Sequence, residues 1–189
     1  PCIQQAFKKD YVPGWFTPLP SGVGDLSMST AVDSRWDNFY LAGLEYLLKE
    51  YNIGGIYVDD STLSRSSMMR ARKLIDQHTP NGHIDLHSWD SFNHLAGWKS
   101  SLLGYVQQMA YIDSLWIGEG RNYDASPAEW LVEASGIPFG LSSQMLRYSD
   151  GGGNPWRGMV FGQTSRLGWG GDPRPIWKLW DDFGMQGCE

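Results

Sequence analysis

Acidic side chains follow two predicted strands, where a pair of carboxylates could do chemistry. The run Ile53–Asp60 is short and apolar and ends on Asp59 and Asp60, while Glu119 lies between glycines after the predicted strand 112–118. Such runs are typical of buried parallel strands. Cleavage of a glycosidic bond requires two carboxyl groups, because one protonates the leaving oxygen and the other attacks or stabilises the oxocarbenium-like centre. Asp59 and Glu119 are therefore the candidate catalytic pair, with Asp60 beside them.

We expect only one of the two adjacent acids to enter the site. Because side chains alternate along a strand, Asp59 shares a face with Tyr57, whereas Asp60 shares the opposite face with Val58. We expect Asp59 to point into the site. Asp60 precedes a Ser-Thr pair and has an equal alternative role as a cap of the next helix. Glu119 stands in a Gly-Glu-Gly turn and has no capping task, which favours a functional role.

Aromatic and polar side chains near the predicted strand ends suit a sugar. Aromatic residues make up 14% of the chain, and many of the ten Trp lie beside Gly, Asp, Asn or Arg. This pattern favours a surface that stacks on flat rings. His87 shares a face with Asp85, which could orient its imidazole, although a histidine satisfied within the core is an equal alternative. The residues predicted to position hydroxyl groups or to stack on sugar rings are His87, Trp89, Trp116, Arg121 and Trp156.

Other site chemistries have less support. The carboxylates and the histidine at the strand ends match no compact metal-ligand spacing, so no metal or other cofactor is predicted. A metal-dependent lyase or hydrolase is the weakest alternative. The glycines at 151–153 lack a preceding strand and a following lysine, and no Gly-x-Ser-x-Gly elbow occurs. We therefore expect acid–base chemistry by carboxyl groups.

Composition limits the classes of partner. The 189 residues are 41% hydrophobic with a formal charge of −6, which suits one well-buried domain and argues against nucleic acid as a partner. No apolar stretch approaches the roughly 20 residues that span a bilayer. Cys2 and Cys188 stand near the two ends. A disulfide between them would suit a secreted protein, and two free or intermolecularly paired thiols are the alternative.

Strands and helices are predicted to alternate after a Pro/Gly-rich loop segment at 1–33. The predicted strands are 53–60, 83–88, 112–118 and 137–141, and the predicted helices are 34–51, 66–77, 100–109, 126–133, 158–166 and 175–183. Four β-α units favour an α/β fold with a parallel sheet and right-handed crossovers. A full eight-unit barrel needs about 250 residues. We therefore predict a partial or half TIM barrel over 34–189, and favour the view that part of the natural protein is absent here.

Several segments together resemble a known group of proteins. They are 35–40 (Arg-Trp-Asp-Asn-Phe-Tyr), 55–60 (Gly-Ile-Tyr-Val-Asp-Asp), 84–89 (Ile-Asp-Leu-His-Ser-Trp), 116–120 (Trp-Ile-Gly-Glu-Gly), 122–124 (Asn-Tyr-Asp) and 135–140 (Ser-Gly-Ile-Pro-Phe-Gly). The chain resembles the catalytic-barrel half of glycoside-hydrolase-like proteins related to glycoside hydrolase family 123. It is more distantly similar to retaining α-galactosidase-type barrels. The resemblance runs from about Trp36 to Gly184.

The resemblance implies two different mechanisms. In the α-galactosidase-like scheme the nucleophile ends the fourth strand and the acid/base ends the sixth, which implies Asp59 and Glu119. Family 123 instead resembles substrate-assisted hexosaminidases, in which adjacent Asp and Glu residues act on an N-acetyl sugar. Here the adjacent pair is Asp59-Asp60, so the Glu of that dyad is lacking. The first scheme fits these residues better.

The predicted function is that of a secreted glycoside hydrolase domain acting on an extracellular carbohydrate. The rival from another class is a non-catalytic, barrel-derived module of an extracellular assembly, with a structural or carbohydrate-binding role. In that case Cys2 and Cys188 would link to partner chains, and other protein chains would complete the barrel. The rival also predicts that Asp59 and Glu119 do not converge in space.

Overall fold

The structure is a computed structural model of the chain, which divides into two compact units. The first unit holds residues 1–87 and 91–113, and the second holds 88–90 and 114–189. The structure describes residues 16–22, 24–26, 35–59, 63–88, 106–117, 124–145, 156, 158–165 and 172–187.

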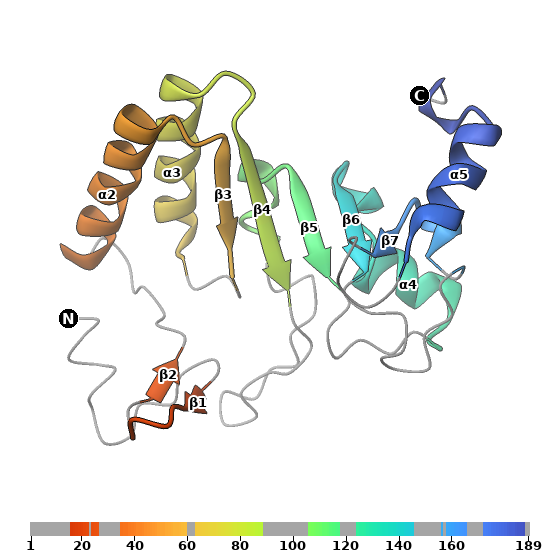
Figure 1. Cartoon of the computed structure of the whole chain (residues 1–189), viewed down its shortest axis with the longest axis horizontal. Coiled ribbons are helices and arrows are strands. Elements are labelled where there is room, and N and C mark those ends of the chain that lie inside the picture. Colours follow the sequence, from red (N-terminus) through yellow and green to blue (C-terminus); the bar gives the residue numbers. More distant parts are fainter. Residues whose placement is uncertain are drawn as a thin grey trace. The chain divides into compact units, whose positions relative to one another are not determined.

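The first unit alternates helices with two parallel strands. In chain order its main elements are α2 (Arg35–Tyr51), β3 (Gly55–Val58), α3 (Arg65–His78), β4 (His83–Ser88) and the short 3-10 helix η2 (Met109–Tyr111). β3 and β4 run in the same direction, with Gly55 opposite His83 and Val58 opposite Leu86 (Figure 1). α3 is the crossover that a parallel pair requires. The predicted helices at 34–51 and 66–77 and the predicted strands at 53–60 and 83–88 are confirmed.

One face of the strand pair is apolar and the other is polar. Val58, Ile84 and Leu86 are buried, and their neighbours Tyr57 and Asp85 point to the opposite face. The helices supply a matching apolar surface, because their spacing of 3.6 residues per turn gathers the buried side chains on one side of each helix. Those helix residues are Leu41, Leu44, Leu48, Met68, Ala71 and Ile75. The polar face is therefore the one left for a site.

Local signals set the ends of the helices. Asn52 has a left-handed backbone (φ 49°) directly after α2, as its place at the predicted stop implies. The Ser64 hydroxyl accepts a hydrogen bond from the Ser67 N–H at 3.2 Å and so caps α3. In the second unit the Ser126 hydroxyl caps α4 (Pro127–Glu133) by accepting from the Glu129 N–H at 3.2 Å. Ser at the cap, Pro at the first position and Glu at the third are residues that favour the start of a helix.

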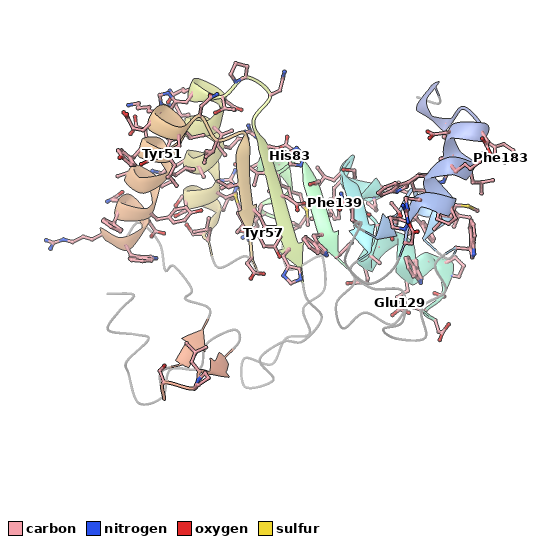
Figure 2. All side chains as sticks on the ribbon, viewed as in Figure 1. Tyr51, Tyr57, His83, Glu129, Phe139 and Phe183 are labelled. Carbon is pink, nitrogen blue, oxygen red and sulfur yellow. The ribbon has the colours of Figure 1, made fainter. Side chains whose placement is uncertain are left out.

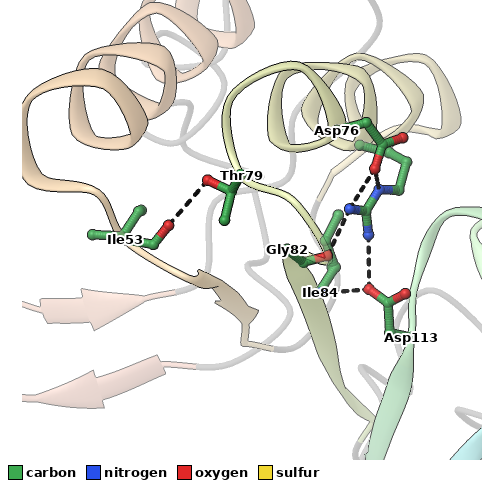
Figure 3. Close-up of polar contacts among 7 residues, drawn as sticks. Ile53, Asp76, Thr79, Gly82, Ile84 and Asp113 are labelled. Carbon is green, nitrogen blue, oxygen red and sulfur yellow. Dashed lines mark hydrogen bonds and ion pairs between the residues drawn. The ribbon is translucent and has the colours of Figure 1, made fainter.

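A polar cluster ties together the amino end of the strand pair (Figure 3). The Arg72 guanidinium donates to Asp113 Oδ2 at 2.7 Å, to Asp76 Oδ1 at 2.8 Å and to the Gly82 carbonyl at 2.6 Å. Asp113 Oδ2 also accepts from the Ile84 N–H at 2.7 Å. One side chain of α3 therefore holds the connection into β4 and the stretch after η2.

The second unit holds three parallel strands. Its elements are β5 (Ser114–Ile117), α4, η3 (Ile137–Phe139), β6 (Ser142–Met145), η5 (Met159–Phe161), β7 (Thr164–Ser165), α5 (Arg174–Asp182) and η6 (Met185–Gly187). Trp116 lies opposite Gln144, and Gln144 opposite Thr164. Trp130 of α4 is buried and stacks on Phe161, with ring centroids 5.6 Å apart. The predicted strand at 112–118 and the predicted helices at 126–133 and 175–183 are confirmed.

The prediction of a strand at 137–141 is wrong. Residues 137–139 form the 3-10 helix η3, Gly140 adopts φ 68°, and the strand begins only at Ser142. Pro138 lacks the N–H that a central strand would donate, and it suits the first turn of a helix instead. The strand β6 therefore begins at Ser142, directly after the range where the sequence predicted a strand.

Three further expectations differ from the structure. The predicted helix at 158–166 is the short helix η5 followed by β7, with Gly162 at φ 66° between them. Within the predicted helix at 100–109, the described residues 106–108 form a turn that leads into η2. The predicted loop segment contains an antiparallel hairpin of β1 (Phe16–Pro18) and β2 (Gly24–Leu26). Gly162 interrupts the first of these predicted helices, and the proline and glycine content of 16–26 concealed the hairpin.

Candidate active site

Asp59 and His87 stand side by side at the carboxyl end of β3 and β4. The register places Val58 opposite Leu86, so the next residue of each strand meets its neighbour on the polar face. His87 Nδ1 lies 2.6 Å from Asp59 Oδ1. The structure thus brings the predicted nucleophile against a residue that the sequence assigned to sugar binding.

Tyr57, two residues before Asp59 and on the same face, is the third member of this cluster. Its hydroxyl donates to Asp59 Oδ1 at 3.2 Å, and its ring stacks on that of His87 with centroids 6.1 Å apart and planes at 24°. Tyr57 is 46% exposed and lies in the arrowhead half of β3, whereas His83 lies at the opposite end of β4 (Figure 2). Tyr57 was not among the predicted site residues, although the alternation that selected Asp59 placed it on the same face.

The two oxygens of the Asp59 carboxyl group differ in their surroundings. Oδ1 receives both hydrogen bonds, while within the described part of the chain no donor reaches Oδ2. The Asp59 side chain is 57% exposed and that of His87 only 9%. An ionised carboxyl group is a pure acceptor, and both of these contacts converge on the same one of its oxygens. Asp59 therefore presents one oxygen toward solvent from a braced position.

The contact also indicates where His87 carries a proton. A carboxylate oxygen can only accept, so Nδ1 must be the protonated nitrogen in this hydrogen bond. The carboxylate on Nδ1 belongs to Asp59 of the neighbouring strand and not to Asp85, which the sequence had suggested. Neighbouring strands lie about 4.8 Å apart, whereas residues i and i+2 of one strand are about 6.6 Å apart, so the cross-strand acid is the nearer partner.

A row of side chains in register across three strands lies in the second unit. Trp116, Gln144 and Thr164 are in register across β5, β6 and β7. Their neighbour Ser143 points to the opposite face, where the Gln163 amide donates both to its hydroxyl and to the carbonyl of Ala134, just after α4. The row thus lies on the sheet face away from α4. Sequence reasoning missed Gln144 because it ended the fourth strand one residue before β6 begins, and it missed Thr164 because it placed that residue in a helix at 158–166.

The remaining predicted site residues divide into two groups. Trp116 is half-buried and Trp156 is 46% exposed, and both belong to the second unit. The others lie outside the described residues: Asp60, Trp89, Glu119, Arg121, Cys2 and Cys188. The separation of Asp59 and Glu119 and the pairing of the cysteines therefore stay predictions.

Searches for a metal site and for a membrane span were negative over the described residues. No group of three or more His, Cys, Asp and Glu side chains in these residues could hold a metal ion. Among the same residues, no helix combines the length and the apolar character required to cross a bilayer.

Comparison with known proteins identifies the family. Residues 1–168 match the family model described as glycoside hydrolase 123, TIM-barrel domain. Searches of curated proteins and of solved structures returned no match. The match confirms both the resemblance and the predicted (β/α)-barrel fold, of which the parallel strands and their helices form a part. The chain belongs to the TIM-barrel domain family of glycoside hydrolase 123.

Proposed function

We propose that this domain cleaves a glycosidic bond in an extracellular carbohydrate, with Asp59 as the nucleophile or charge stabiliser and Glu119 as the general acid/base. The observation that carries the proposal is the state of Asp59: half exposed at the carboxyl end of β3, with Oδ1 held by two donors and Oδ2 presented. In barrel enzymes of this type the active site lies at the carboxyl end of the strands. The family supports the class of reaction.

The retaining scheme uses the two carboxyl groups in turn. Asp59 Oδ2 attacks the anomeric carbon while the bond to the leaving oxygen breaks, and protonated Glu119 gives its proton to that oxygen. Glu119, now ionised, then removes a proton from water, whose oxygen attacks the anomeric carbon and releases Asp59. Asp59 suits the first role because both its hydrogen bonds are accepted at Oδ1. A general acid would instead have to donate a proton.

Membership of family 123 favours a second candidate, the substrate-assisted scheme. There the acetamido oxygen of the sugar attacks its own anomeric carbon while the bond to the protonated leaving oxygen breaks, and a carboxylate stabilises the acetamido nitrogen. Water then attacks the anomeric carbon and releases the acetamido oxygen. Asp59 Oδ2 would accept the hydrogen bond from that N–H, and Asp60 would take the acid position. Both candidates use the same oxygen of Asp59 and differ in whether it forms a covalent bond.

Nitrophenyl glycosides distinguish these candidates. We would assay the full chain on 4-nitrophenyl α- and β-glycosides of galactose, glucose and their 2-acetamido forms. The retaining scheme predicts turnover without an acetamido group and rescue of Asp59→Ala by azide, which forms a glycosyl azide. The substrate-assisted scheme predicts turnover of 2-acetamido sugars only. In the retaining scheme Glu119→Gln should abolish turnover and leave binding intact, and wild-type-like hydrolysis by that variant would remove Glu119 from the mechanism.

Absence of turnover on every substrate, together with sugar binding by calorimetry, would favour the non-catalytic module instead.

We further propose that the protein is secreted and that Cys2 pairs with Cys188. Mass spectrometry after alkylation without reduction tests this pairing, because a disulfide leaves both cysteines unlabelled. Labelling of both would contradict it. Cross-linked species on a non-reducing gel would favour links to partner chains.

A further inference from the structure

We propose that His87 and Tyr57 are positioning residues that clamp Asp59 through Oδ1 and thereby direct Oδ2 at the substrate. This inference rests on the proposed function for its consequence in catalysis, but its geometry can be tested without any activity. It replaces the earlier expectation that His87 binds sugar hydroxyls. It also assigns a role to Tyr57, which the sequence analysis left out.

Asp59 requires a clamp because of its place in the chain. It follows the last residue of β3 in a turn, and its side chain is 57% exposed. An exposed aspartate at the end of a strand would otherwise sample several rotamers. Two donors on one oxygen select a single orientation, and hydrogen bonds to an ionised group are about twice as strong as neutral ones. The clamp thus fixes the direction of Oδ2 in the free protein.

The two donors are themselves fixed by the fold. His87 lies in β4, is nearly buried, and has the ring of Tyr57 against its own ring. Tyr57 lies within β3, opposite Asp85 of β4. Both donors therefore stand on paired strands, while the group that they hold stands beyond the pairing. A site built on rigid elements is more precise than one built on a loop.

A misdirected carboxylate should slow the chemical step more than it weakens binding. Displacement of a reacting group by about 1 Å can cost on the order of 100-fold in rate. Loss of the clamp should therefore lower kcat and leave KM within about two-fold, because an interaction felt mainly in the transition state appears in kcat. A merely structural role for His87 would instead lower stability and leave kcat of the folded protein unchanged.

Matched substitutions separate position from charge and size. His87→Asn places an amide N–H close to where Nδ1 lies, whereas His87→Gln places it close to Nε2. We expect His87→Asn to retain most of kcat, and His87→Gln to lose about 10- to 100-fold. Tyr57→Phe removes the second donor and keeps the stacked ring, and should lose a smaller factor of about three to ten. Equal activity of the Asn and Gln variants, both folded by circular dichroism, would overturn the clamp.

Nitrogen-15 NMR of the imidazole provides the readout that needs no substrate. The chain has four histidines, and the His87→Asn spectrum identifies the signals of His87. We expect Nδ1 of His87 to carry a proton at neutral pH in the wild type, and to lose this preference in Asp59→Leu. A bare Nδ1 in the wild type would overturn the clamp.

The two experiments also separate this inference from the proposed function. If Nδ1 carries the proton as expected but no glycoside is turned over, the clamp stands and the hydrolase function falls. If Asp59→Asn abolishes hydrolysis while His87→Gln and Tyr57→Phe match the wild type, the hydrolase function stands and the clamp falls.

Discussion

The two ends of the β3–β4 pair differ in how many hydrogen-bond partners their polar side chains have. At the amino end the Arg72 guanidinium meets three acceptors within 2.8 Å, and its side chain is only 17% exposed. At the carboxyl end Asp59 is 57% exposed and its Oδ2 meets no donor in the described part of the chain. The same two strands thus carry a network of three Arg72 hydrogen bonds at one end and, at the other, a carboxylate oxygen with no donor among the described residues.

This difference separates stability from function along one pair of strands. Polar groups that already have their partners hold elements together and have little left to offer a ligand. A carboxylate such as Asp59, held at one oxygen and with the other oxygen open, contributes little to holding elements together and can accept a hydrogen bond from a ligand. The arrangement agrees with the general behaviour of barrels, in which the amino-terminal face supports the fold and the carboxyl-terminal face carries the chemistry.

The largest expected effect is on catalysis, at the carboxyl end. Asp59→Asn should lower kcat by about 1,000-fold, which corresponds to roughly 4 kcal/mol of transition-state stabilisation. The same variant should change the free energy of unfolding by about 0.5 kcal/mol or less, because the site is exposed. Initial rates on the best nitrophenyl substrate and urea unfolding give both quantities. A large loss of stability would contradict the separation of the two ends.

Arg72→Leu should show the reverse pattern at the amino end. It leaves Asp113 and the Gly82 carbonyl without their charged donor, and we expect a loss of about 2–3 kcal/mol in the free energy of unfolding. The control Arg72→Lys keeps the charge but not the planar fork, and should lose less. Urea unfolding measures the loss. A fall in kcat of more than about two-fold in the folded variant would show that the two ends are energetically coupled, which would contradict their separation.

Gly55→Ala tests the close approach of the strands at the same end. A Cβ at Gly55 would lie 2.0 Å from the His83 carbonyl oxygen, so the strands must move apart, at a cost of about 1–3 kcal/mol. Gly54→Ala is the matched control, because its Cβ would meet nothing within 4 Å. Thermal unfolding of the two variants compares them. Equal melting temperatures of the two variants would show that the pairing of β3 and β4 accommodates a side chain at Gly55.

The smallest effect concerns a surface pair away from both ends. A hydrogen bond from Lys49, together with its charge, lowers the pKa of Glu45 below its ordinary value of 4.5. A lowered pKa contributes stability that is present above the ordinary value and is lost as the pH falls through the lowered one. Glu45→Gln should therefore lower the melting temperature slightly at pH 7, with the two curves converging in acid.

Hydrophobic period and helix-forming residues were sufficient to predict the four α-helices of the described residues and the strands β3, β4 and β5. The apolar spacing of α2, the alternation of β4 and the Ser126 cap of α4 are local properties, and each helix or strand formed where the pattern placed it. The misplaced strand at 137–141 shows the limit of this reasoning. Its apolar run was short, and the conformations of Pro138 and Gly140 outweighed its composition.

The site also divides into features that local sequence predicted and features that it did not. The sequence determined that an acid would end β3 on the polar face, because alternation and chain order are local. Only the tertiary structure decided that Asp59 meets His87 of the neighbouring strand, and that His87 and Tyr57 share one of its oxygens. The physical reason is that a cross-strand contact depends on the register of two strands separated by a whole helix. That register is set by packing and by polar contacts at the far end of the strands, which no single segment encodes.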